Sequence, residues 1–221
     1  MHVLVIGASR GLGLEFVRQY RGDGASVTGS ARSDDALARL RALGATAMRL
    51  DVADTASAAG LARQIDGARF DVAVLAAGVY GPRTGGLETP SEADFDAVMH
   101  TNVLGAMRVL PQLAEALAPG ARLAVISSKM GSIGERRSSA GWLYRASKAA
   151  LNSVFRDVAL ALAGRAVCVA FHPGWVRTDM GGAGADLDVE VSVASMRRTI
   201  ASLTAADHGR FLNHDGSPIG W

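Results

Sequence analysis

Short, continuously apolar runs alternate with segments of helical spacing, and this alternation constrains the fold more than any other feature of the chain. The first run, His2–Ile6, is rich in β-branched residues and precedes Leu12, Phe16 and Tyr20, which lie four positions apart. Such a run predicts a strand buried on both faces, and the spacing of four predicts a helix. Strands that alternate with helices form parallel sheets, so we expect an α/β, doubly wound parallel sheet of about seven strands with helices on both faces.

The same alternation continues to the end of the chain. Further strands are predicted at residues 25–30, 46–50, 70–76, 121–127, 166–171 and 209–212. Helices are predicted at residues 34–43, 53–65, 91–100, 103–117, 144–163 and 189–203. Asp34 or Asp35 is the candidate N-terminal cap of the second helix, and Gly44 is its stop. No repeat or linker interrupts the pattern, so we expect residues 1–221 to form one domain.

Charge and hydrophobicity exclude several classes of partner. The 23 Lys and Arg residues nearly balance the 21 Asp and Glu residues, without a basic run, so we expect no nucleic-acid partner. No segment approaches the roughly 18 uninterrupted apolar residues of a membrane span, and the first apolar run is too short for a secretion signal. The lone cysteine, Cys168, lies in an apolar run and is expected to be buried packing, with no metal site. These features predict a soluble, cytoplasmic protein.

A glycine-rich loop connects the first predicted strand to the first predicted helix. Gly7 permits a tight turn, Gly11 lets the backbone approach a pyrophosphate, and Gly13 lets helix and strand pack closely. The helix N-terminus offers free N–H groups and a partial positive charge to phosphates. The alternative is a purely structural glycine turn. We predict a dinucleotide site built from Gly7, Ser9, Arg10, Gly11, Leu12 and Gly13.

The end of the second predicted strand bears on the choice between the two nicotinamide dinucleotides. An acidic residue there would bond the ribose 2′-hydroxyl of NAD, but this strand ends in Ser30-Ala31-Arg32. Arg32 can pair with a 2′-phosphate, and Arg10 lies on the same side. NADP(H) is therefore favoured over NAD(H), with two ordinary exposed arginines as the alternative.

The third and fourth predicted strands also end in residues that suit a dinucleotide. Asp51, followed by Val52, can accept a hydrogen bond from an adenine amino group, unless it is a helix cap. Small residues after the fourth strand let the backbone pass close to a flat ligand. These residues are Ala76, Ala77 and Gly78.

A tyrosine and a lysine stand one helical turn apart at the start of predicted helix 144–163. A phenol is a poor acid, with a reference pKa of about 10. The Lys148 ammonium is expected to lower the pKa of Tyr144, so that the phenol can donate and recover a proton near neutrality. Ser127 and Ser128 end the preceding strand, where a hydroxyl can polarise a substrate carbonyl. A helix cap or a turn is the alternative for both serines.

Taken together, these motifs resemble the short-chain dehydrogenase/reductase family, in the family's order, from residue 7 to residue 179. The resemblance rests on the glycine loop, Asp51-Val52, Ala76-Ala77-Gly78, Thr101-Asn102-Val103, Ser127-Ser128, Tyr144-x-x-x-Lys148 and Pro173-Gly174-Trp175-Val176-Arg177-Thr178-Asp179. The short chain and residues 129–133 are most similar to the C-factor-like and sniffer-like carbonyl reductases. The resemblance implies a single-domain Rossmann-type fold.

The resemblance also implies a role for individual residues. Ser128 would orient the substrate carbonyl, Tyr144 would act as acid and base, and Lys148 would also hold the nicotinamide ribose. Asn102 would position a water in a proton relay, unless it only satisfies a helix kink. Thr178 would hold the nicotinamide carboxamide. The same loop would supply further cofactor contacts through Pro173, Gly174 and Val176.

The expected activity is hydride transfer between NADP(H) and a small carbonyl or alcohol substrate. Ser128 and Tyr144 are sixteen positions apart, more than is usual in the family, so Ser127 and Ser132 are alternatives for the serine. An apolar pocket or ordinary packing would explain the flanking side chains Tyr80, Met130, Trp142, Trp175 and Met180. In relatives the faces of helices 103–117 and 144–163 pair between subunits, which implies a homodimer or homotetramer. The rival functions are an NADP(H)-binding redox-sensing or signalling protein, and a sugar-nucleotide epimerase.

Overall fold

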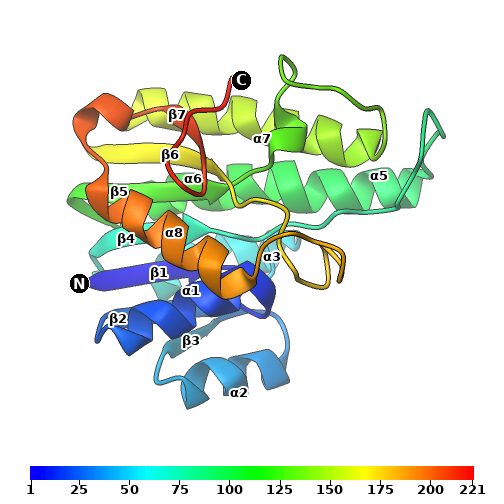
Figure 1. Ribbon diagram of the computed structural model, residues 1–221. Helices are drawn as coiled ribbons and strands as arrows, with labels where there is room; N and C mark the ends of the chain where they lie inside the picture. Colours follow the sequence, from blue (N-terminus) through cyan, green and yellow to red (C-terminus); the bar gives the residue numbers. More distant parts are fainter.

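The strands and helices follow one another in the order that the apolar runs predict. The structure, a computed structural model, describes residues 1–221. Its strands are β1 His2–Ile6, β2 Ser26–Ala31, β3 Thr46–Arg49, β4 Phe70–Leu75, β5 Leu117–Ile126, β6 Ala166–His172 and β7 Arg210–Asn213 (Figure 1). Its α-helices are α1 Gly11–Gly22, α2 Asp34–Ala42, α3 Thr55–Ala59, α4 Leu61–Gln64, α5 Glu92–Met99, α6 Gly105–Glu115, α7 Trp142–Ala161 and α8 Val189–Ser202. Three short turns complete the set: the π-helical η1 His100–Leu104 and the 3-10 helices η2 Lys129–Gly131 and η3 Ala205–Asp207.

The seven strands form one parallel sheet with the order β3-β2-β1-β4-β5-β6-β7. Val3 on β1 pairs with Val27 on β2 and with Val72 on β4, and it is fully buried. The strand order reverses between β1 and β4, and ligands of open parallel sheets bind beside the carboxyl ends of the strands at such a point. The prediction of a doubly wound α/β fold is confirmed.

Helices cover both faces of the sheet, and each face has its own apolar core (Figure 1). On one face, Phe16 of α1, Leu40 of α2 and Met196 of α8 pack against the strands. On the other face, α4, α6 and α7 bury a second cluster that includes Val109 and Phe155. Both layers exclude water from the strands, which accounts for the long apolar runs within the inner strands β1 and β6. None of the helices combines the length and the apolar character that crossing a membrane requires.

The cap of α2 differs from the prediction. Ser33, rather than Asp34 or Asp35, is the N-cap, and its hydroxyl accepts a hydrogen bond from the Ala36 N–H at 3.4 Å. Ser33 has an extended backbone, whereas the two aspartates already belong to the first helical turn. Their carboxylates favour that turn through the helix dipole instead. The predicted stop is correct, since Gly44 follows the helix with a φ of +73°.

Two other predicted helices have different boundaries. Residues 53–65 form two short helices, because Gly60 ends α3 and Asp54, not an earlier residue, caps it. Residues 92–115 form α5, η1 and α6 without a break, and the predicted gap is a widened π turn. Helix α6 ends at Glu115, and Ala118 already lies in β5, because Pro119 disfavours the helical conformation of the residue before it. Strand β5 therefore begins earlier than predicted, at Leu117.

Candidate active site

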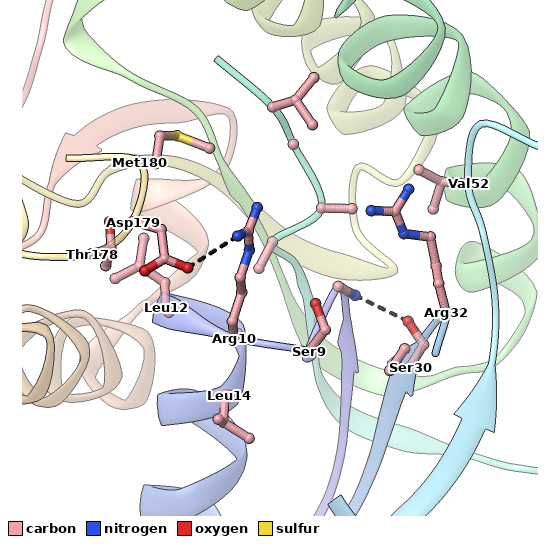
Figure 2. A pocket seen from close by; sticks show the side chains of 18 of the residues that line it. Ser9, Arg10, Leu12, Leu14, Ser30, Arg32, Val52, Thr178, Asp179 and Met180 are labelled. Carbon is pink, nitrogen blue, oxygen red and sulfur yellow. Dashed lines mark hydrogen bonds and ion pairs between the residues drawn. The ribbon is translucent and has the colours of Figure 1, made fainter. Parts of the chain in front are cut away.

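A groove beside the carboxyl ends of β1 to β4 contains the glycine loop (Figure 2). We call it the glycine-loop groove, and its volume is about 530 Å³. The structure brings most of the predicted cofactor residues together in its lining. They are Gly7, Ser9, Arg10, Gly11, Leu12, Gly13, Arg32, Asp51, Val52, Ala76, Ala77, Gly78 and Thr178.

Two glycines let backbone segments of this groove approach closely. Gly7 has a φ of +87°, and a β-carbon there would lie 2.6 Å from backbone atoms of Ala77. A β-carbon on Gly13 would lie 2.1 Å from the carbonyl oxygen of Gly7. The first turn of α1 has no side-chain cap, since Arg10 at the N-cap position makes no capping hydrogen bond. Its N–H groups and partial positive charge remain available to an anion such as a phosphate.

Four arginines line this groove, and one of them, Arg177, pairs with Asp188 at 2.8 Å; Figure 2 labels Arg10 and Arg32. Arg10 pairs with Asp179 at 3.0 Å, and Arg32 pairs with Asp51 at 3.4 Å. Arg39 of α2 donates to the Ser9 carbonyl at 3.2 Å, and the sequence analysis did not identify it. The side chains of Arg10, Arg32 and Arg39 are exposed, so the two ion pairs of Arg10 and Arg32 are weak and can exchange partners.

Asp51 is not a helix cap, which was the alternative for this residue. Asp54 caps α3, because its carboxylate accepts from the Ser57 N–H at 2.7 Å. One Asp51 oxygen accepts from the Ala53 N–H at 3.0 Å, and the other pairs with Arg32. The carboxylate thus stays at the edge of the groove, where its hydrogen-bonding capacity is not exhausted.

A second cavity, of about 610 Å³, adjoins the groove and contains the proposed catalytic tyrosine. We call it the tyrosine pocket. Leu12, Thr178 and Met180 line both cavities, so the two are continuous at these residues. A ligand lying in the groove could therefore present one end to a second molecule in the pocket.

Tyr144 lies at the start of α7 and is 7% exposed. Its ring stacks on that of Tyr80, with the centroids 4.5 Å apart. Burial raises the pKa of Tyr144 well above its ordinary value, and a hydrogen bond with Ser128 lowers it in part. The phenol is therefore protonated at neutral pH and is placed beside the hydroxyl that the sequence analysis paired with it.

The three candidate serines differ in the partners of their hydroxyls. Ser127 donates to the Asn152 side chain at 2.5 Å, and Ser132 donates to the Gly220 carbonyl at 2.7 Å. Both hydroxyls are therefore used in holding the structure. Ser128 also accepts from the Met130 N–H at 3.1 Å, so its alternative role as a turn cap exists alongside its contact with the tyrosine.

Lys148 does not lower the pKa of Tyr144 here, contrary to the expectation from their spacing. Its ammonium donates to the Ile126 carbonyl at 2.9 Å and lies 5.7 Å from the Tyr144 ring centroid. Burial of the charge lowers the pKa of Lys148 to about 8. Burial also dominates the pKa of the tyrosine. The pKa of Lys148 is therefore lowered and the pKa of Tyr144 is raised, which is opposite to the shifts that attraction between an ammonium and a phenolate would cause.

We expect the buried charge of Lys148 to make the stability difference between wild type and Lys148→Met depend on pH. The folded-state pKa of about 8 lies below the unfolded value of 10.5, so the charge destabilises the fold fully below pH 8. This penalty disappears as the pH rises to 10.5. The free energy of unfolding of wild type should therefore rise by on the order of 3 kcal/mol relative to the variant between pH 7 and pH 10.5. Urea unfolding of both proteins measures this difference. If the difference in the free energy of unfolding between the two proteins were constant with pH, the Lys148 ammonium would not be destabilised by its burial.

Asn102 anchors the loop that follows β4. It lies in the π turn η1, accepts from the Val79 N–H at 2.8 Å and donates to the Val79 carbonyl at 2.8 Å. It also donates to the Ser147 hydroxyl at 2.9 Å, a contact that the sequence analysis missed. Asn102 and Lys148 line neither cavity directly but lie behind Gly78, whose β-carbon would come within 3.3 and 3.4 Å of them. The water relay predicted for Asn102 stays a prediction.

The loop after β6 contributes to the tyrosine pocket more than to the groove. Thr178 lines both cavities and accepts from the Gly181 N–H at 3.1 Å. The predicted cofactor residues Pro173, Gly174 and Val176 line the tyrosine pocket alone.

Four of the five flanking side chains predicted from the sequence line the tyrosine pocket, namely Tyr80, Met130, Trp175 and Met180. Trp142 does not line it, because its indole N–H turns away to donate to the Glu88 carbonyl at 2.9 Å.

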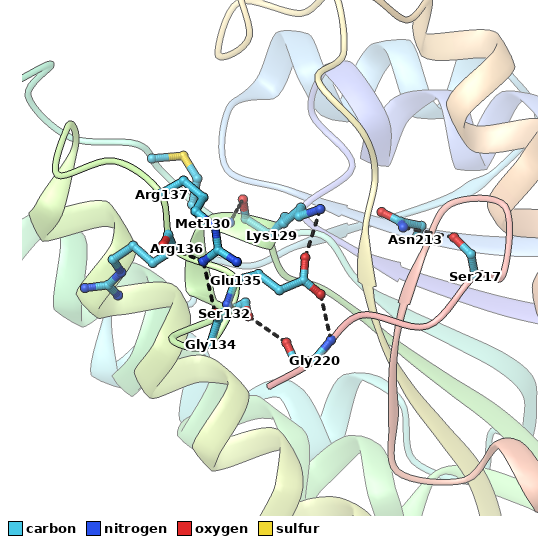
Figure 3. A network of polar contacts seen from close by, with 11 residues as sticks. Lys129, Met130, Ser132, Gly134, Glu135, Arg136, Arg137, Asn213, Ser217 and Gly220 are labelled. Atoms are coloured by element: carbon cyan, nitrogen blue, oxygen red, sulfur yellow. Dashed lines mark hydrogen bonds and ion pairs between the residues drawn. The ribbon is translucent and has the colours of Figure 1, made fainter.

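A polar network ties the segment after Ser128 to the end of the chain (Figure 3). Lys129 pairs with Glu135 at 2.8 Å, and Glu135 accepts from the Gly220 N–H at 2.9 Å. Trp221 stacks on Phe211 with the ring centroids 5.3 Å apart. These contacts fix one wall of the tyrosine pocket. They join residues far apart in the chain, so no local sequence pattern indicated them.

Comparisons with known proteins identify the family of this chain. Residues 1–186 match the family model for the short chain dehydrogenase. C-signal of Myxococcus xanthus is 39% identical over 132 residues, which cover 58% of this chain and 80% of that protein. The carbonyl reductase Sniffer of D. melanogaster is 28% identical, with a TM-score of 0.88 over 100% of this chain and 99% of that one. A carbonyl reductase from Pseudomonas aeruginosa PAO1 in complex with NADP is 30% identical, with a TM-score of 0.86 over the same shares of the two chains.

Proposed function

This chain belongs to the short-chain dehydrogenase/reductase family and is similar to its members C-signal and Sniffer, and from that premise we propose a specific activity. The protein transfers a hydride between NADP(H) and a small carbonyl or alcohol substrate, with Tyr144 as the acid and base. One observation supports this above all: Tyr144 and Ser128 both line a pocket that is continuous with the glycine-loop groove.

The groove fits a dinucleotide in shape and in charge. Gly7 and Gly13 let the backbone segments around the groove pack closely, and the uncapped start of α1 suits a pyrophosphate. Lys148 and Asn102 support the floor of the groove behind Gly78. When bound, NADPH supplies the hydride to the carbonyl carbon.

Tyr144 supplies the proton that the substrate oxygen needs as negative charge develops on it. A phenol whose pKa is raised by burial keeps its proton at neutral pH, which is the form required for reduction. Ser128 donates a hydrogen bond toward the same oxygen and orients the carbonyl. In the reverse direction the phenolate would accept the proton, so alcohol oxidation should become faster as the pH rises.

The groove also favours NADP(H) over NAD(H). Arg32, at the end of β2, can leave its exposed partner Asp51 for a 2′-phosphate, and Arg10 and Arg39 lie along the same groove. No acidic residue ends β2, so nothing there would repel that phosphate. The bound NADP in the Pseudomonas aeruginosa relative supports the same preference.

Arg32→Ala should weaken the binding of NADPH about tenfold to a hundredfold and change the binding of NADH little. The lost contact is a charge-assisted hydrogen bond to the 2′-phosphate, which NADH lacks. Calorimetric titration with both dinucleotides measures this. Arg41→Ala, an exposed arginine on the following helix α2 and outside the groove lining, is the control. An equal loss for both dinucleotides would show that Arg32 only supports the fold.

A panel of aldehydes and ketones tested with NADPH, with the absorbance of the reduced nicotinamide followed over time, tests the proposed activity. The similarity to C-signal favours a second candidate, a signalling protein that binds NADP(H) with little turnover. Tight NADPH binding without oxidation by any carbonyl compound would favour that candidate. A cytoplasmic location and pairing through α6 and α7 into a homodimer or homotetramer stay predictions.

A further inference from the structure

The tyrosine pocket carries an excess of positive charge. Its charged lining residues are Arg83, Lys129, Arg137, Arg145 and the single carboxylate Glu135. Glu135 forms an ion pair with Lys129 at 2.8 Å, so the charges of these two residues neutralise each other. Three guanidinium groups therefore remain without a carboxylate partner, although acidic and basic residues nearly balance over the whole chain.

Arg145 is the most unusual of the three, because it is only 9% exposed. Its one hydrogen bond runs from Nε to the Ala140 carbonyl at 2.8 Å. A buried guanidinium normally pairs with a carboxylate, since an uncompensated buried charge is costly. Its two terminal nitrogens have no hydrogen-bond partner and are not fully buried, and the residue lines the tyrosine pocket.

The position of Arg145 relates it to the reacting groups. It follows Tyr144 in α7, and both residues line the pocket together with Ser128. An anion bound by Arg145 would therefore belong to the molecule whose carbonyl faces the phenol. The bond to Ala140 fixes the side chain but uses only one of the five donors of the guanidinium.

The other two cations are exposed and are held by neutral partners. Arg83 donates to the Met180 carbonyl at 2.6 Å and lies over the ring of Tyr80, 5.0 Å from its centroid. Arg137 donates to the carbonyls of two neighbouring loop residues. Both keep their full charge at the pocket, where they would attract an approaching anion.

From these contacts we propose that the pocket selects carbonyl substrates that carry an anionic group, a carboxylate or a phosphate, bound by Arg145. The planar guanidinium matches the two oxygens of either anion, and the burial of Arg145 strengthens the contact. Arg83 and Arg137 contribute attraction at longer range. This assignment rests on the proposed oxidoreductase function and adds the substrate class to it.

Matched aldehydes test the assignment through the ratio of their kcat/KM values. The probes are 4-carboxybenzaldehyde, 4-formylphenyl phosphate and the neutral 4-methylbenzaldehyde, each with NADPH. Wild type should prefer at least one anionic aldehyde to the neutral one by about tenfold or more, and Arg145→Gln should lower that preference about tenfold. Arg145→Lys, which keeps the charge, should retain part of the preference. Arg69→Gln, an exposed arginine outside the pocket lining, should leave it unchanged.

Two results would overturn the assignment. The first is a wild type that shows no preference for either anionic aldehyde. The second is an Arg145→Gln variant that reduces all three aldehydes more slowly by the same factor, as expected of a residue that only holds the Ala140 segment. If wild type reduced none of the three aldehydes, the proposed activity toward them would fail. Calorimetric titration with benzoate would then decide the anion site separately. Weaker benzoate binding in Arg145→Gln supports the site, and equal or absent binding in both proteins refutes it.

Discussion

Tyr144→Phe should lower the turnover number for carbonyl reduction by about a thousandfold, because it removes the only proposed proton donor to the substrate oxygen. Phenylalanine keeps the ring that stacks on Tyr80, so the pocket should keep its shape. The phenol oxygen is next to Ser128 and is not part of the glycine-loop groove. The affinity for NADPH should therefore stay close to that of wild type. Steady-state kinetics and calorimetric titration of the same preparation measure both effects.

Tyr20→Phe is the matched control for this substitution. Tyr20 is a buried tyrosine of α1 whose ring packs against the Arg197 guanidinium, 4.3 Å from the ring centroid, and its hydroxyl lines neither cavity. Its loss should cost about 1 kcal/mol of stability and leave turnover unchanged. A residual turnover above about one tenth of wild type in Tyr144→Phe would rule out the phenol as the main proton donor. A parallel loss of NADPH binding would indicate a disturbed fold instead.

The strands were predictable because each carries its own evidence in consecutive residues. Strand β1 has the predicted bounds, and the others differ by at most a few residues. The boundaries of helices depended on less local information. The π turn η1 forms where Asn102 reaches across to Val79, a contact between segments that no helical periodicity describes.

The residues of the site were predictable wherever chemistry and spacing act within one segment. Tyr144 and Lys148 lie on one helix, and the glycines lie in one loop. The choice of Ser128 over Ser127 needed the structure, because both serines end the same strand and only their partners differ. The sequence also could not predict that Arg145 lacks a carboxylate partner, because this depends on which carboxylates the folded loops bring near it.

The effect of Lys148 shows why proximity in sequence does not determine a pKa. The spacing correctly places the ammonium near the phenol, but burial of each group outweighs their mutual attraction. Desolvation depends on the packing of the surrounding elements, which a spacing of four residues does not contain.

Gly13→Ala should reduce both the stability of the protein and its catalytic efficiency. The added β-carbon would lie 2.1 Å from the carbonyl oxygen of Gly7 and 3.0 Å from the α-carbon of Ala8. These are backbone atoms, so a rotamer change cannot relieve the clash, and α1 must move away from the glycine loop. We expect a loss of about 3 kcal/mol in the free energy of unfolding. Displacement of the loop should lower kcat/KM with NADPH about a hundredfold.

Gly22→Ala separates the clash from the general effect of replacing a glycine in this helix. Gly22 lies in the last turn of α1, and a β-carbon there would meet no atom within 4 Å. It should change stability by less than about 1 kcal/mol and leave kcat/KM intact. Urea unfolding and steady-state kinetics on both variants provide the comparison. If Gly13→Ala bound NADPH and turned over like Gly22→Ala, close contact between helix and loop would not be what forms the nucleotide site.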